Sequence, residues 1–110
     1  MGIPGLTQYA QKTIPIAQKS LAAASISNSY SIVGSIFNNP VVLLIIVSTL
    51  DQAVQISWDG VTDHLPMPAG GTLVLDFRSD NTTFPGVYGV YAKEIGNPTT
   101  GTLYVSAFTV

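Results

Sequence analysis

Few side chains in this sequence could carry out catalysis. His64 is the single histidine, cysteine is absent, and the 110 residues include six Asp or Glu and four Lys or Arg. A serine nucleophile would need His64 as its base and an acid to orient that base. Asp63 is adjacent to His64, but neighbouring residues on a strand point to opposite faces. No Gly-x-Ser-x-Gly motif is present either. The sequence therefore predicts a protein that is not an enzyme.

Aspartates could instead bind a metal, because Ca²⁺ prefers several oxygen ligands. The segment from Asp59 to Asp63 lacks the alternating ligand spacing and the closing glutamate of an EF-hand loop. Asp at the start of a loop also accepts hydrogen bonds from the backbone two residues on. We interpret Asp51 and Asp59 as turn residues of this kind. We therefore expect no metal site, and we expect no other cofactor.

Low charge is the main compositional feature of the chain. The formal net charge is −2, and no Asp, Glu, Lys or Arg occurs from Ser20 to Leu50. Net charge keeps soluble proteins apart, so a neutral surface favours association with other protein subunits. The basic residues are too few and too scattered to bind nucleic acid; they are Lys12, Lys19, Arg78 and Lys93. We expect a homo-oligomer with protein partners and no nucleic acid.

From Tyr30 onward the sequence has the pattern of a β protein. Runs rich in β-branched and aromatic residues alternate with Gly, Pro, Asn and Asp. The expected strands are Tyr30–Phe37, Val41–Ser48, Ala53–Trp58, Asp63–Met67, Thr72–Phe77, Val87–Lys93 and Thr102–Thr109. Asp59-Gly60 is a hairpin signal. This spacing predicts an all-β fold, a small antiparallel β-sandwich or jelly-roll-like domain over residues 30–110.

The run from Val41 to Val47 is apolar at every position. With Pro40 included the apolar run has eight residues. As a helix it would rise about 12 Å, against a bilayer core of about 30 Å, so we expect no membrane contact. A strand that is apolar throughout is covered on both faces. One face would lie on the core, and we expect the other to meet a partner subunit. The candidate interface residues here are Val42, Leu44 and Ile46.

Residues 1–29 differ from the rest of the chain. They contain Pro and Gly and show no sustained hydrophobic period. They also contain more large apolar side chains than a segment surrounded by water would carry. We therefore expect an N-terminal arm that binds a neighbouring subunit. The candidate interface residues of this arm are Ile3, Leu6, Ile14, Ile16 and Leu21.

Four short motifs lie between Asn39 and Val110. They are Ile56-Ser57-Trp58-Asp59-Gly60-Val61-Thr62-Asp63, Pro68-Ala69-Gly70, Leu75-Asp76-Phe77 and Gly101-Thr102-Leu103-Tyr104-Val105-Ser106. In these motifs the chain resembles small β-rich virion proteins of short-tailed bacteriophages. Its length and neutrality are most similar to those of capsid cement or staple proteins. The resemblance implies a jelly-roll-like decoration subunit, assembled in the host cytoplasm, that binds the major capsid protein and neighbouring copies of itself on the capsid exterior.

Two alternative functions stay open. Similar strands occur in other virion proteins, so a head–tail connector or a tail component is the first alternative, and a closed cyclic oligomer would distinguish it. A carbohydrate-binding module is the second, and it would present a row of exposed aromatic rings. Aromatic residues are equally common in sandwich cores and subunit interfaces. The candidate rings are Trp58, Tyr88, Tyr91, Tyr104 and Phe108.

Overall fold

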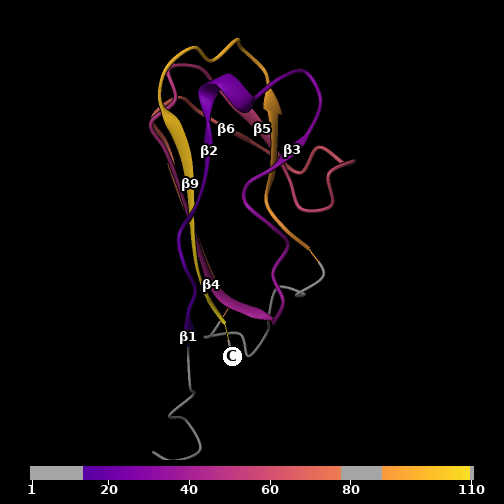
Figure 1. Ribbon diagram of the computed structural model, residues 1–110, viewed down its shortest axis with the longest axis vertical. Helices are drawn as coiled ribbons and strands as arrows, with labels where there is room; N and C mark the ends of the chain where they lie inside the picture. Colours follow the sequence, from indigo (N-terminus) through magenta and orange to yellow (C-terminus); the bar gives the residue numbers. More distant parts are fainter. Residues whose placement is uncertain (1–13, 78–87, 110) are drawn as a thin grey trace, which may run out of the picture.

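The computed structural model describes residues 14–77 and 88–109. Within these ranges nine strands form two antiparallel sheets that pack face to face as a sandwich (Figure 1). The fold is all-β, as the sequence predicts. The expected interface residues Ile3 and Leu6 lie outside the described residues.

Five strands form sheet A and four form sheet B. Sheet A consists of β1 (Ile14–Pro15), β2 (Lys19–Ala22), β4 (Val41–Ser48), β7 (Thr72–Asp76) and β9 (Thr102–Thr109). Sheet B consists of β3 (Ser31–Ile32), β5 (Val54–Ser57), β6 (Leu65–Met67) and β8 (Tyr91–Glu94). A short 3₁₀ helix, η1 (Ala23–Ser25), follows β2. In sheet A, β1 and β2 both pair with β9, and β4 and then β7 follow on its other side.

The strand pairs are nested around the β5–β6 hairpin. β5 pairs with β6, β4 with β7, β3 with β8, and β2 with β9. Successive pairs alternate between the two sheets, and the β4–β9 and β5–β8 pairings complete each sheet. The chain is thus one long hairpin wound into a sandwich, which is the topology of a jelly roll.

The expected strands differ from the observed ones mainly in length. Val41–Ser48 and Thr102–Thr109 have the predicted bounds. The predicted strand Tyr30–Phe37 is reduced to β3, because Gly34 has a φ of +77° and interrupts the extended conformation soon after Ile32. The predicted strand Val87–Lys93 is represented by β8, which begins at Tyr91.

The expected boundary between an arm and a domain after residue 29 needs correction. β1 and β2 pair with β9, and Ala23 and Ile26 are buried in the core of the sandwich. Leu21 lies opposite Leu103 and packs against the same core. Residues 14–29 therefore belong to the jelly roll. Without them β9 would be an edge strand, and the interior would lose the side chains of Leu21, Ala23 and Ile26.

Two loops at one end of the sandwich are joined by a carboxylate. Asp51 accepts a hydrogen bond from the Thr99 N–H at 2.9 Å and another from the Thr99 hydroxyl at 2.7 Å. These hydrogen bonds lower the pKa of Asp51, and the bond from the Thr99 hydroxyl contributes most. Asp51 therefore fixes the β8–β9 loop onto the β4–β5 loop, a longer-range role than the local turn expected from the sequence.

Candidate interaction surface: the outer face of sheet A

The side chains of β4 alternate between the interior and the outside. Leu44 and Ile46 have no exposed surface and belong to the hydrophobic core between the sheets. Val42 has no exposed surface either. Since side chains on a strand alternate, the intervening positions point to the outer face of sheet A. They are Leu43, Ile45 and Val47, of which the first two are half-buried and the last is exposed.

The interface expected on this strand is therefore corrected by one position. Leu44 and Ile46 are covered by the molecule's own interior, and Val42 has no exposed surface. The accessible side chains of this strand are therefore Leu43, Ile45 and Val47. A run that is apolar at every position has no period, and a shift of one residue exchanges the two faces of a strand. The ladder resolves the ambiguity, because Ile46 lies opposite Val105 while Ile45 lies opposite Ser106. No signal within the run itself could have done so.

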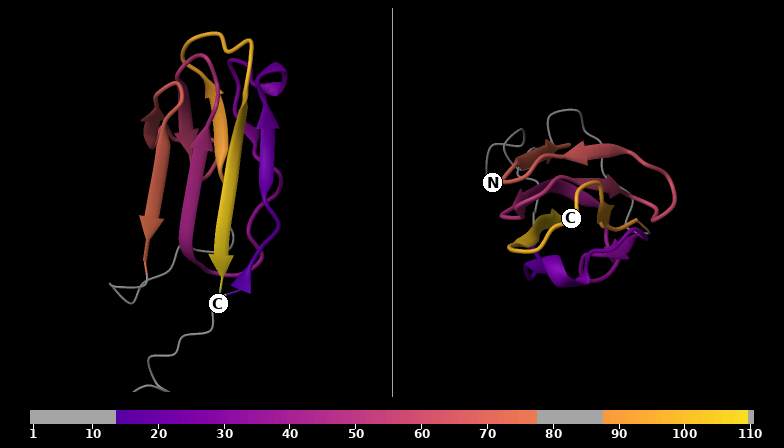
Figure 2. Two further views of the ribbon diagram at one scale, coloured as in Figure 1. Left: turned by 90° about the vertical axis from the view of Figure 1, so that its left-hand side faces the viewer. Right: turned by 90° about the horizontal axis from the view of Figure 1, so that it is seen from above.

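The outer face of sheet A, called the A face below, has three rows of side chains across β9, β4 and β7. Figure 2 (left) shows these strands side by side, with β9 in yellow, β4 in magenta and β7 in orange. The ladders give the rows as Tyr104, Val47 and Thr72, then Ser106, Ile45 and Val74, and then Phe108, Leu43 and Asp76. Residues from three separate parts of the chain thus share one surface.

Apolar side chains dominate the A face. Val74 is 56% exposed and Val47 is 37% exposed, whereas Tyr104 and Phe108 are half-buried. A shallow hollow lies over the middle of the face, and it is lined by Gln18, Val47, Tyr104 and Ser106. Among the described residues in these rows, Asp76 on β7 is the one charged side chain. The face can therefore bind a partner through apolar contact but offers little for ionic recognition.

The remaining arm residues expected at the interface lie beside β9. Ile14 pairs with Thr109 and is 40% exposed. Ile16 donates its backbone N–H to the Ala107 carbonyl at 3.0 Å, and its side chain packs against the core. Of the three described arm residues, Ile14 is thus the one with an accessible side chain, since Leu21 also faces the core.

Charged groups gather on the opposite surface, over sheet B. Lys93 Nζ lies 3.1 Å from Asp63 Oδ1 and 4.8 Å from the centre of the Tyr30 ring. The Tyr30 hydroxyl donates to the same Asp63 carboxylate. These interactions lower the pKa of Asp63, and the hydrogen bond from Tyr30 contributes most. The pKa of Tyr30 is raised, mainly by burial and next by its hydrogen bond to Asp63. The three side chains satisfy one another.

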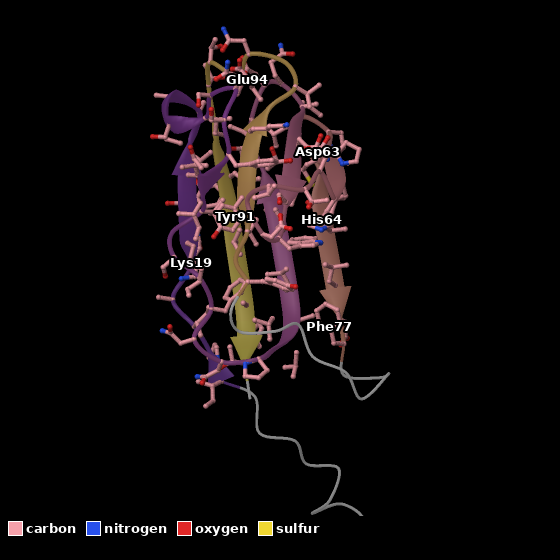
Figure 3. All side chains as sticks on the ribbon, turned by 90° about the vertical axis from the view of Figure 1, so that its right-hand side faces the viewer. Lys19, Asp63, His64, Phe77, Tyr91 and Glu94 are labelled. Carbon is pink, nitrogen blue, oxygen red and sulfur yellow. The ribbon has the colours of Figure 1, made fainter. Side chains whose placement is uncertain are left out.

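His64 and Asp63 have different partners. Figure 3 shows both residues on the sheet B side of the molecule. His64 Nδ1 accepts a hydrogen bond from the Trp58 backbone N–H at 3.1 Å, and the two rings stack with centroids 6.1 Å apart. Asp63 instead contacts Tyr30 and Lys93. His64 thus helps to hold the β5–β6 loop.

The carboxylate of Asp59 organises the same loop. It accepts hydrogen bonds from the N–H groups of Val61 at 2.9 Å and Thr62 at 2.8 Å, and from the Ser57 hydroxyl at 2.9 Å. These hydrogen bonds lower the pKa of Asp59, and the bond from the Thr62 N–H contributes most. Gly60 follows with a φ of +80°. The loop therefore has the turn chemistry expected from Asp59-Gly60. Within residues 14–77 and 88–109, no three His, Cys, Asp or Glu side chains lie close enough to hold a metal ion.

In the described part of the chain, no helix has the length and apolar character needed to cross a membrane. No protein-family model matches the chain, and no curated protein or solved structure is similar enough to count as a match. The resemblance to phage virion proteins therefore depends on the sequence motifs alone, and it stays a prediction.

Proposed function

We propose that the protein is a non-enzymatic structural subunit of a tailed phage virion. It decorates or cements the capsid from the outside, where it binds the major capsid protein and neighbouring copies of itself. The observation that carries this proposal is the A face, an apolar sheet surface on which Asp76 is the one charged side chain among the described residues. Exposed apolar surface of this kind marks protein interaction sites. The jelly roll supports the proposal, because viral capsid proteins are among the proteins that use it.

The size of the A face favours binding in many copies. The A face is formed by two strands of eight residues, β4 and β9, and one of five, β7, and it covers roughly 340 Å² at about 4.8 Å between strands and about 3.4 Å per residue. A stable pairwise interface buries about 800 Å² on each partner. One such contact is therefore weak alone. On a capsid, each contact with the shell or with a neighbouring copy holds the other binding sites close to their partners. This raises their effective concentration, so that several weak contacts together give stable attachment.

The aromatic rings do not favour the carbohydrate-binding alternative. Trp58 stacks on His64, and the Tyr30 hydroxyl is bonded to Asp63. The Tyr91 ring lies against the β5–β6 loop, where a Cβ added at Gly60 would meet it at 3.1 Å. These rings are used in contacts within the protein. Of the other candidate rings, Tyr88 is exposed, whereas Tyr104 and Phe108 are half-buried on the A face.

Co-sedimentation with capsids assembled from the major capsid protein tests the proposal. We expect the wild-type chain to pellet with the capsids and Ile45→Thr to pellet less, because this substitution places a hydroxyl at the centre of the A face. Gln55→Thr is the matched control, since Gln55 lies on β5 in sheet B. A wild-type chain that stays in the supernatant, or an Ile45→Thr variant that binds as well as wild type, would contradict the proposal.

A further inference from the structure

The four sheet edges among the described residues, one of them shared by β1 and β2, differ in how well they are protected against pairing with another chain. Proteins protect sheet edges with Pro, with Lys or with very short strands. β6 contains Pro66, β3 has two residues, β1 contains Pro15, and β2 begins with Lys19. β7, Thr72-Leu73-Val74-Leu75-Asp76, is a five-residue strand with neither Pro nor Lys, and its one charged side chain, Asp76, is at its last position.

The hydrogen bonds to β4 show which backbone groups of β7 point outward. The Ser48 N–H donates to the Gly71 carbonyl at 2.8 Å, and the Phe77 N–H donates to the Val42 carbonyl at 2.9 Å. In an antiparallel ladder the bonded residues alternate, so the odd-numbered residues of β7 bond to β4. The N–H and C=O groups of Thr72, Val74 and Asp76 therefore point away from β4. Among the described residues, no strand pairs with this side of β7.

The sequence of β7 is suited to pairing with itself. In an antiparallel pair centred on Val74, Val74 lies opposite Val74 of the second copy. Leu73 then faces Leu75, and Thr72 faces Asp76. No two carboxylates are opposed, because each Asp76 faces Thr72 of the other copy. Val74 would exchange two N–H···O bonds with Val74 of the second copy. We propose that a second copy of this chain pairs with β7 edge to edge, antiparallel, about a two-fold axis through Val74.

This pairing joins two A faces into one continuous apolar surface. In each copy the outward side chains of β7 lie in the same rows as those of β4, so Val74 of the two copies continues the row of Ile45. The pairing deepens the proposed function, because it specifies how two neighbouring copies of the subunit meet. It does not depend on capsid binding, so the association of the purified chain and its binding to capsids can fail separately.

Two substitutions at Val74 separate edge pairing from contact through the A face. Val74→Pro removes an outward N–H without removing a bond to β4, and Pro is tolerated on an edge strand in this situation. Val74→Thr keeps the N–H and the branched shape but makes the A face more polar. We expect sedimentation equilibrium of the full chain, raised from micromolar to millimolar concentration, to show association to a dimer for wild type and Val74→Thr. We expect Val74→Pro to give the mass of a monomer.

Three results would overturn the proposal: a monomeric wild type, a dimeric Val74→Pro variant, or dissociation by Val74→Thr to the same degree as by Val74→Pro. If circular dichroism shows that Val74→Pro does not fold, disulfide cross-linking of a cysteine variant tests the pairing instead. The chain has no cysteine, and paired residues about 5.5 Å apart at Cα are within reach of a disulfide. Val74→Cys should then oxidise mainly to a dimer. Val61→Cys, on the exposed β5–β6 loop, should stay mainly monomeric. Equal yields of dimer from the two variants would refute the pairing.

Discussion

Replacing Ile46 with Thr should destabilise the folded chain far more than the same replacement at Ile45. The two residues are identical and adjacent, but Ile46 is fully buried opposite Leu73 and Val105. Ile45 is half-buried on the A face. The substitution removes two carbons: the terminal methyl group, worth about 0.8 kcal/mol when buried, and a methylene whose place is taken by oxygen. It also introduces a hydroxyl, which costs about 1–3 kcal/mol in an apolar interior without a partner.

The expected loss of unfolding free energy is therefore about 2–4 kcal/mol for Ile46→Thr and below about 1 kcal/mol for Ile45→Thr. Urea denaturation followed by far-UV circular dichroism measures both values, with the slope of each transition checked against wild type. Because small domains are stable by only about 5–15 kcal/mol, the first loss is readily detected. Equal losses, or a larger loss at Ile45, would refute the assignment of the two faces of β4.

Further predictions concern the loops, the pH dependence and the N-terminus. Gly101→Ala should reduce the melting temperature strongly, because Gly101 has a φ of +94° and an added Cβ would collide with the Thr49 carbonyl. Gly70→Ala, with positive φ but open space, should cost only about 1 kcal/mol. The pKa of Asp59 is lowered in the folded state, so its contribution to stability is present above its ordinary pKa of 3.8 and is lost as the pH falls below it. Asp59→Asn should therefore make stability less dependent on pH in acid, while added calcium should leave the melting temperature unchanged. Deleting residues 1–13 should preserve the circular dichroism spectrum and weaken association, whereas a deletion that extends through β2 should unfold the chain.

The fold class and several strands could be predicted from the sequence because their signals are local. Asp59-Gly60 identifies the β5–β6 hairpin through turn chemistry, and Gly60 has the expected positive φ. Strand β9 alternates between buried and half-buried residues along its length, which fits the period expected of a strand that lines a core. Pro66 lies on an edge strand, as the loss of a backbone donor requires.

The features that could not be predicted depend on distant parts of the chain. β2 consists of four residues, and its partner β9 begins about eighty positions later, so nothing local identifies Leu21 as a core residue. The apolar run of β4 has no period, and its neighbours in the sheet decide which side chains face inward. The A face was therefore expected in outline, as a second covered face, but with the wrong side chains from β4.

Electron cryomicroscopy of assembled phage particles that contain this chain is the most direct test of the proposed function. Density for a jelly roll should lie on the outside of the capsid, with the A face against a neighbouring subunit and out of contact with solvent. Location of the chain in the tail or at the head–tail junction, or an A face that is open to solvent in the assembled particle, would contradict the proposal.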